Sequence, residues 1–133
     1  MFKANRIPGW IAYGGVLFVP VRLSGARFYF MVDSGAAFCG INRMLLDKII
    51  AEPTGKTRSV APLGKELIST PTLRIENFVV GGLKENGFEV SVFDFLVGFQ
   101  IDGVLGMDFM GKYRITIEPD NKTLILREIP KKK

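Results

Sequence analysis

Hydrophobic and polar residues alternate along much of the chain with the two-residue period of β-strands, in short runs separated by turn-forming residues. The segment VLFVPVRLSGARFYFMVD, at 16–33, contains two such runs around Ser24 and Gly25. It predicts a hairpin in which Pro20, which lacks a backbone N–H, suits an edge position. The segment YRITIEPDNKTLILREI, at 113–129, predicts a second hairpin with its turn at 119–122.

Four further segments between these hairpins also favour strands. KTRSVAPLGKELIS, at 56–69, predicts an exposed hairpin because its proline and glycine suit a type I turn. LRIENFVVGGL, at 73–83, predicts a strand pair or a strand with a glycine turn. FEVSVFDFLVGF, at 88–99, is apolar enough to be buried on both faces. IDGVLGMDFMGK, at 101–112, has an apolar centre between glycines and then a possible helical turn.

One segment has a helical pattern instead. In NRMLLDKII, at 42–50, the apolar residues follow helical spacing and Asn42 can cap the first turn. Pro53 and Gly55 are expected to end this short helix. The whole pattern therefore predicts a mostly β protein, largely antiparallel, with one or two short helices.

The length of 133 residues favours a single domain over residues 1–133. We expect the N-terminal segment 1–12 and the basic tail 129–133 to be peripheral to it. The net charge of +5 suggests nucleic-acid binding at first sight. However, three of the charges belong to Lys131, Lys132 and Lys133, which leaves 15 basic residues against 13 acidic ones. The charge is therefore interpreted as a solvated tail, and no nucleic-acid partner is expected.

The chain contains no histidine, which excludes Ser-His-Asp and Cys-His catalysis and any zinc site with histidine ligands. The single cysteine, Cys39, cannot form an internal disulfide and is expected to be a small buried residue. No metal or other cofactor is expected, and carboxylates, lysines and tyrosines remain as catalytic groups. No signal peptide is evident, the apolar run 10–21 is too short to span a membrane, and the compartment stays unknown.

The segment FMVDSGAAFCGIN, at 30–42, delivers Asp33 into a stretch of small residues. An ordinary turn is one interpretation, because aspartate, serine and glycine all favour turns. The preceding apolar residues instead favour a carboxylate at a buried strand end. Ala36 and Ala37 would leave space on its open side.

Over Val16 to Leu126 the chain resembles the retropepsin-like aspartic proteases. The resemblance rests on four elements in order: PVRLSGARFYFMVDSGAA with the Asp-Ser-Gly-Ala signature, SVAPLGKEL in the position of the flap hairpin, DGVLGMDFM, and the closing hairpin YRITIEPDNKTLIL. It implies a closed β-barrel of the acid protease fold and the activity of an aspartic endopeptidase acting on a peptide or protein substrate.

The resemblance also implies site residues. Asp33 would be catalytic, with Ser34 and Gly35 supporting the catalytic pair. The other implied residues are Ala36, Ala37 and the flap tip Ala61, Pro62, Leu63 and Gly64 for substrate binding, and Val104, Leu105 and Gly106 for packing behind the aspartate. Viral members usually carry an acidic residue at the position of Ala37, so their substrate preferences are not expected to apply here.

Peptide hydrolysis by carboxylates requires two of them close enough to share a proton. The chain has one Asp-Ser-Gly, while Asp47 and Asp120 fall at positions expected to be solvated, and Asp94 is a candidate buried hydrogen-bond acceptor. A twofold homodimer would supply the second Asp33, as the resemblance implies.

Two alternatives stay open. The same fold could serve as a dimerisation or ligand-binding module with little or no turnover. The second alternative is an unrelated small β-barrel that binds nucleic acid through its basic residues.

Overall fold

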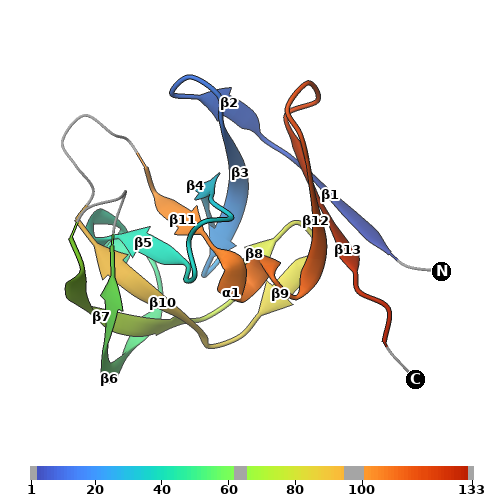
Figure 1. The fold of residues 1–133 in the computed structure, drawn as a ribbon. Helices are drawn as coiled ribbons and strands as arrows, with labels where there is room; N and C mark the ends of the chain where they lie inside the picture. The colour runs from blue at the N-terminus through green and yellow to red at the C-terminus, as the bar shows by residue number, and fades with distance from the viewer. Residues whose placement is uncertain (1–2, 62–65, 95–100, 132–133) are drawn as a thin grey trace.

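The computed structural model describes residues 3–61, 66–94 and 101–131, and strands dominate these ranges (Figure 1). A three-stranded sheet has the order β1 (Ala4–Pro8), β13 (Thr123–Glu128), β12 (Tyr113–Glu118). A larger, curled sheet has the order β6 (Ala51–Val60), β7 (Ile68–Ile75), β10 (Phe88–Phe93), β5 (Gly40–Asn42), β11 (Gly103–Leu105), β4 (Ala26–Val32), β3 (Val16–Leu23), β8 (Phe78–Val80), β9 (Leu83–Glu85), and β2 (Trp10–Ala12) pairs with β3. The short helices are the 3₁₀ helix η1 (Arg43–Lys48) and α1 (Met107–Met110). The prediction of a mostly β fold with short helices is confirmed.

The hairpin of β3 and β4 forms as predicted. Leu23 pairs with Ala26, and the two turn residues, Ser24 and Gly25, have φ angles of 54° and 87°. Two consecutive positive φ angles match the right-handed twist of the flanking strands. On its other edge, β3 pairs with β2 only as far as Phe18 and with β8 only from Arg22 onward. Pro20 therefore lies between these two pairings, where no described strand pairs with the outer edge of β3 and the lack of an N–H group costs no strand-to-strand hydrogen bond.

Two parallel pairs depart from the antiparallel pattern that the sequence favoured. β11 lies parallel to β4, with Gly103 opposite Phe30, and β10 lies parallel to β5. A Cβ atom on Gly103 would lie 2.5 Å from the Phe30 ring, so only glycine fits there. This close approach lets β11 run beside β4, and it brings segments about seventy residues apart in sequence to the same edge.

The helix predicted at 42–50 is present, but it is shorter than expected. The Asn42 side chain accepts a hydrogen bond from the Met44 N–H at 3.0 Å, and η1 ends at Lys48. Pro53 and Gly55 do not end the helix, because both lie inside β6 at an irregularity in its pairing with β7. Gly55 has a φ of 77°, which suits a bulge.

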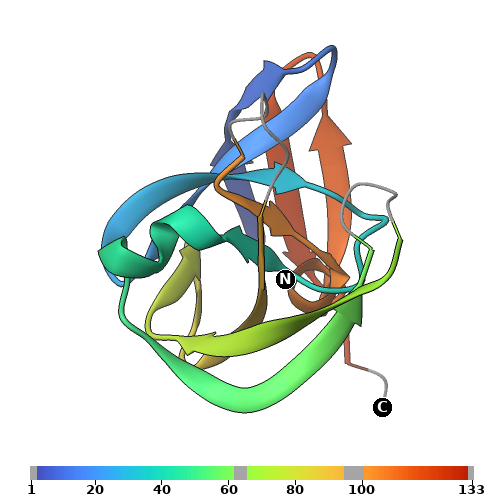
Figure 2. The ribbon, with the colours of Figure 1, turned by 90° about the vertical axis from the view of Figure 1, so that its left-hand side faces the viewer.

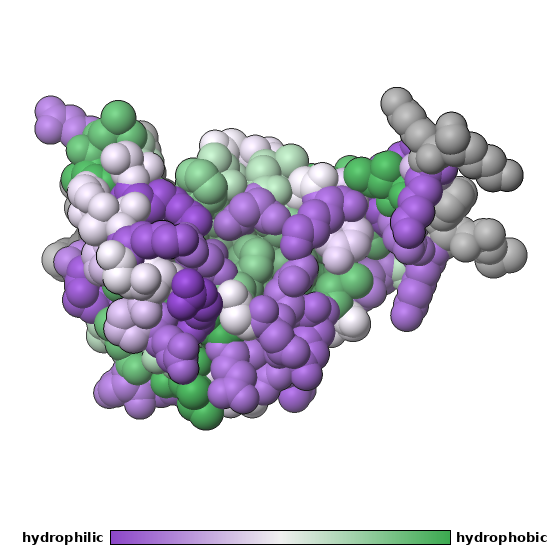
Figure 3. Space-filling model, turned by 90° about the horizontal axis from the view of Figure 1, so that it is seen from below, coloured by the Kyte–Doolittle hydropathy of each residue, from purple (hydrophilic) through white to green (hydrophobic). Residues whose placement is uncertain are grey.

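The interior is filled by side chains from both sheets. Phe78 lies between Phe30 and Phe109, with ring centroids 6.0 Å and 5.5 Å apart, and all three rings are buried. Figure 2 shows the β6–β7 hairpin curving around the outside of the molecule. The face seen from below is mostly hydrophilic, with scattered smaller hydrophobic areas (Figure 3).

The N-terminal segment takes part in both sheets. β1 pairs with β13 from Ala4 opposite Arg127 to Pro8 opposite Thr123, and β2 pairs with β3. Gly9 joins them, and its N–H donates to the Lys122 carbonyl at 2.8 Å. Among the residues that the structure describes, no helix is long and apolar enough to cross a membrane.

Candidate active site

Asp33 directly follows β4, and β11 holds its backbone. The Asp33 N–H donates to the Leu105 carbonyl at 3.1 Å, which extends the parallel pairing of β4 and β11 by one residue. The side chain is half-buried, and its Oδ1 accepts a hydrogen bond from the Gly35 N–H at 2.9 Å. Its Oδ2 has no hydrogen-bond partner among residues 3–61, 66–94 and 101–131. One carboxylate oxygen is thus fixed while the other remains available.

The residues after Asp33 form a tight turn. The Ala36 N–H donates to the Asp33 carbonyl at 3.1 Å. A Cβ atom on Gly35 would lie 3.2 Å from Asp33 Oδ1, so this position leaves little room for a side chain. Ser34 is exposed, and its hydroxyl makes no hydrogen bond within the described part of the chain. This turn presents a carboxylate and a hydroxyl together at the surface.

The loop after β11 supports this turn from behind. The Met107 N–H donates to the Ala36 carbonyl at 2.8 Å, and the Asp108 N–H donates to the Ala37 carbonyl at 3.0 Å. A Cβ atom on Gly106 would lie 2.7 Å from the Phe38 carbonyl group and 2.9 Å from the Ala36 carbonyl oxygen. Glycine is therefore required for the two loops to pack. Val104, Leu105 and Gly106 are all buried.

Cys39 lies between the two loops and is fully buried, as predicted. Its Sγ accepts a hydrogen bond from the Gly106 N–H at 3.2 Å, and its N–H donates to Asp108 Oδ1 at 3.0 Å. Burial, and then the Asp108 carboxylate nearby, raise the pKa of the Cys39 thiol well above its usual value. The residue thus links the loops as a neutral thiol.

Apart from Asp33 and Asp108, the aspartates of the chain have other partners or lie in solvent. Asp102 Oδ2 accepts a hydrogen bond from the Tyr29 N–H at 2.9 Å. The expectation of a buried acceptor at Asp94 is wrong, because its side chain is 79% exposed and pairs with Arg43 at 3.1 Å. It follows directly after β10, where the chain leaves the sheet. Asp47 and Asp120 are exposed, as expected.

The β6–β7 hairpin contributes a contact that the sequence did not indicate. Its arms pair as far as Val60 opposite Ile68, while the expected tip residues Pro62, Leu63 and Gly64 lie outside the described residues; Ala61 is exposed. Arg58 lies over the Phe38 ring at 3.9 Å and binds Glu89 at 2.9 Å.

This contact joins β6 to the segment that follows the Asp33 turn. Phe38 and Arg58 are twenty positions apart in sequence and Glu89 lies on another strand, β10, so no local pattern connects them. The alternation of polar and apolar residues in the sequence places Arg58 on one face of a strand. It does not predict which residues contact that face.

Comparison with known proteins decides the family. A family model described as aspartyl protease matches residues 19–109, which is most of the chain. The chain belongs to this family. Among solved structures it resembles a retropepsin-like aspartic protease from Rickettsia conorii, with a TM-score of 0.63 and 17% sequence identity over 96% of this chain and 93% of that one. A search among curated proteins found no match.

The aspartyl protease match runs from within β3 to within α1, so it contains both loops described above. The structural likeness extends further, because it covers 96% of the chain. The predicted membership of the retropepsin-like family and its fold are therefore confirmed.

Proposed function

We propose that this chain is an aspartic endopeptidase that acts as a homodimer, with Asp33 of each copy forming the catalytic pair. The observation that carries the proposal is the state of the Asp33 carboxylate. It is half-buried at the end of β4, with Oδ1 held by the Gly35 N–H and Oδ2 free of partners among the described residues. A fixed carboxylate with one available oxygen suits proton transfer.

The chemistry requires two carboxylates that carry one proton between them. The ionised carboxylate takes a proton from a water molecule, whose oxygen attacks the scissile carbonyl carbon. The protonated carboxyl donates its proton to the carbonyl oxygen. When the tetrahedral intermediate collapses, the carboxyl that took the proton from water passes it to the amide nitrogen, a hydroxyl group of the intermediate returns a proton to the other carboxylate, and the C–N bond breaks. No covalent intermediate forms, which fits a chain without histidine.

A second copy is the source of the second carboxylate in this proposal. Asp102 and Asp108, the aspartates on either side of β11, accept hydrogen bonds from the backbone N–H groups of Tyr29 and Cys39. Their carboxylates stabilise the fold and are poor candidates for the missing partner. A twofold axis beside Asp33 brings two copies of the same group together, as an isologous contact does.

Ser34 and Gly35 have supporting roles in this dimer. The exposed Ser34 hydroxyl, which has no hydrogen bond within the described chain, is free to bond across the axis. The Gly35 N–H keeps Asp33 Oδ1 in place. Ala36 and Ala37 provide space for substrate beside the carboxylates, while Val104, Leu105 and Gly106 pack behind them.

The β6–β7 hairpin would act as the flap, with its tip at Ala61, Pro62, Leu63 and Gly64. A flap covers the bound peptide and excludes bulk solvent from the site, apart from the water molecule that reacts. The contact of Arg58 with Phe38 and Glu89 supports this role, because it holds one arm of the hairpin beside the Asp33 segment.

The test is cleavage of an unstructured protein and a broad peptide library at mildly acidic pH by the wild-type chain and by Asp33→Asn. We expect the wild type to cleave and the variant to lose at least about 10³-fold in rate, because asparagine can neither take nor give the proton. Cleavage that survives in highly purified Asp33→Asn would disprove the mechanism. A wild-type dimer that cleaves nothing would favour the binding module.

The dimer is tested separately by light scattering and by mixing. When wild-type chains are mixed with an excess of Asp33→Asn chains, most wild-type chains should form mixed dimers. Each mixed dimer contains only one Asp33. We expect the activity to fall further than dilution alone explains, since both carboxylates must come from intact copies. Activity strictly proportional to wild-type chain, at concentrations where scattering shows exchange, would contradict the shared pair.

A further inference from the structure

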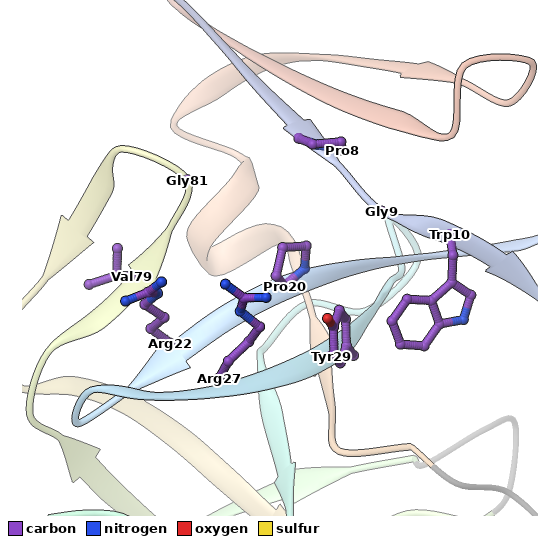
Figure 4. A pocket seen from close by; sticks show the side chains of 9 residues that line it. All are labelled: Pro8, Gly9, Trp10, Pro20, Arg22, Arg27, Tyr29, Val79 and Gly81. Carbon is purple, nitrogen blue, oxygen red and sulfur yellow. The ribbon is translucent and has the colours of Figure 1, made fainter.

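An open groove of about 440 Å³ lies on the outer face of the β3–β4 hairpin, apart from the Asp33 turn (Figure 4). The residues from β3, β4 and β8 that line it include Pro20, Arg22, Arg27, Tyr29 and Val79, and Trp10 closes it at one end. None of these residues belongs to the two loops around Asp33. The groove has a cationic end and an aromatic end, joined by the surface around Pro20.

The cationic end is formed by two arginines that have no acidic partner in the part of the chain that the structure describes. Arg22 and Arg27 are opposite each other in the β3–β4 pairing, so their side chains leave the same face of the hairpin. Both are exposed, and neither forms an ion pair or side-chain hydrogen bond within the described residues. Like charges placed directly opposite each other repel. A bound carboxylate would relieve this repulsion, and the guanidinium groups offer it paired N–H donors.

The aromatic end is already packed. The Trp10 and Tyr29 ring centroids are 4.0 Å apart at an interplanar angle of 52°, and Trp10 also lies against Phe18 at 5.9 Å. Trp10 nevertheless remains 40% exposed. Because the ring is held by its neighbours, it forms a rigid apolar wall and not a free platform for stacking a planar ligand.

The middle of the groove lies beside a stretch of β3 that pairs with neither β2 nor β8, next to Pro8 and Gly9. On the outer edge of β3, pairing with β2 stops at Phe18 and pairing with β8 begins at Arg22. Pro20 in this gap has a carbonyl group but no N–H, so the edge accepts hydrogen bonds more readily than it donates them. An extended peptide can offer its own N–H groups to such an edge.

The spacing of the two ends matches an extended peptide. Arg22 lies four positions after Phe18, the partner of Trp10, which corresponds to about 13 Å along a strand. A single small anion cannot reach both ends. We propose that this groove binds an extended acidic peptide segment, with one or two carboxylates at Arg22 and Arg27 and an apolar side chain three or four positions away against Trp10.

This proposal does not rest on peptide hydrolysis at Asp33, and the test keeps the two apart. The full chain with Asp33→Asn is titrated with the peptide acetyl-Glu-Asp-Ala-Ala-Leu-amide and with its reversed sequence. Trp10 is the only tryptophan in the chain, so its fluorescence reports directly on the groove. We expect a saturable blue shift with at least one of the two peptides, because binding covers the exposed indole, and weaker binding at high salt.

The variants Arg22→Gln and Arg27→Gln should each weaken this binding by about tenfold, and the double variant by more. Their folding is expected to be intact, since each removes a repulsion. Arg114→Gln is the matched control. Arg114 is exposed and lies opposite Arg127 in the other sheet, so it too belongs to a cross-strand arginine pair. It should leave the affinity within about twofold, because Arg114 is not among the residues that line the groove.

Three outcomes would overturn the proposal. The first is the absence of any fluorescence change with both acidic peptides. The second is equal binding of a peptide in which glutamate and aspartate are replaced by glutamine and asparagine, or equal binding by the Arg22→Gln/Arg27→Gln variant. The third is an equal shift with inorganic phosphate alone, which would make the groove a site for small anions.

Discussion

The loops after β4 and after β11 begin alike but use their carboxylates in opposite ways. The two strands run parallel and paired, and each leads into a turn that contains a glycine. In the second loop, Asp108 Oδ1 accepts the Cys39 N–H. In the first, Asp33 keeps one oxygen without a partner among the described residues. The second carboxylate stabilises the fold, whereas the first is available for chemistry.

The difference extends to the backbone. Gly106 is buried against carbonyl groups of the first loop, while Gly35 is exposed and a Cβ atom there would approach only the Asp33 side chain. The second loop therefore supports the first, and the first can present its carboxylate at the surface. Changes in the second loop should reduce stability, whereas changes in the first should reduce activity. Four predictions test this separation.

The largest expected effect comes from the two glycines. Gly106→Ala forces a Cβ atom to within 2.7–2.9 Å of backbone atoms that cannot rotate away, so we expect a loss of about 3 kcal/mol or more in the free energy of unfolding. Gly35→Ala should lose less than about 1 kcal/mol, because its Cβ approaches only the Asp33 side chain. Chemical denaturation measures both. Equal losses would mean that the loops share the structural role.

The aspartates are the next pair. Asp108→Ala leaves the buried Cys39 N–H without an acceptor, which should cost about 1–3 kcal/mol of stability. Asp33→Ala removes only the bond to the exposed Gly35 N–H and should cost about 0.5–1 kcal/mol. Activity should follow the opposite order, with Asp33→Ala inactive and folded Asp108→Ala retaining turnover. An Asp33→Ala variant less stable than Asp108→Ala would reverse the comparison.

A smaller effect concerns the external support of the first loop. Arg58→Met loses the contact with Phe38 and the ion pair with Glu89, in which the two side chains are 19% and 30% exposed. We expect a loss of about 1 kcal/mol, limited because Arg58 Nη1 is itself buried without a partner in the described structure.

The control for this change is Arg43→Met, which breaks the exposed pair with Asp94 and should cost less than about 0.5 kcal/mol. Hydrogen exchange should show faster exchange of β6 amides in Arg58→Met only. Unchanged exchange in that variant would mean that β6 is held to the Asp33 segment by other contacts.

Local chemistry explains which elements the sequence could predict. The hairpin at Ser24 and Gly25, the cap at Asn42 and the Asp-Ser-Gly turn each depend on neighbouring residues, and each is present where its pattern indicated. The expectation that Pro53 and Gly55 end the helix is wrong for the same reason. As local signals they end helices, but pairing with β7 places them in a bulged strand.

The support of the Asp33 turn could not be predicted locally. Gly106 fits against Phe38 and Ala36, and Arg58 covers Phe38, although these residues are far apart in the chain. Such contacts depend on the parallel placement of β11 beside β4, which a short run of apolar residues between glycines does not specify. The packing of the two loops was predicted only through the family resemblance. The residues themselves predicted only a carboxylate at a buried strand end.

The smallest predicted effect tests the cysteine between the loops. Because the folded state raises the pKa of the Cys39 thiol, it retains the thiol proton after the unfolded chain has released it. Stability from this source is fully present below the unfolded thiol pKa of about 8.5 and is lost as the pH rises above it, by about 0.7 kcal/mol between pH 8 and pH 9. Chemical denaturation of wild type and Cys39→Ala across this range should show the extra decline in the wild type alone. The difference between the two chains isolates the thiol, since every other titrating group is common to both. Parallel curves would show that Cys39 ionises as easily in the folded chain as in the unfolded one, and that the contact between the loops is open to water.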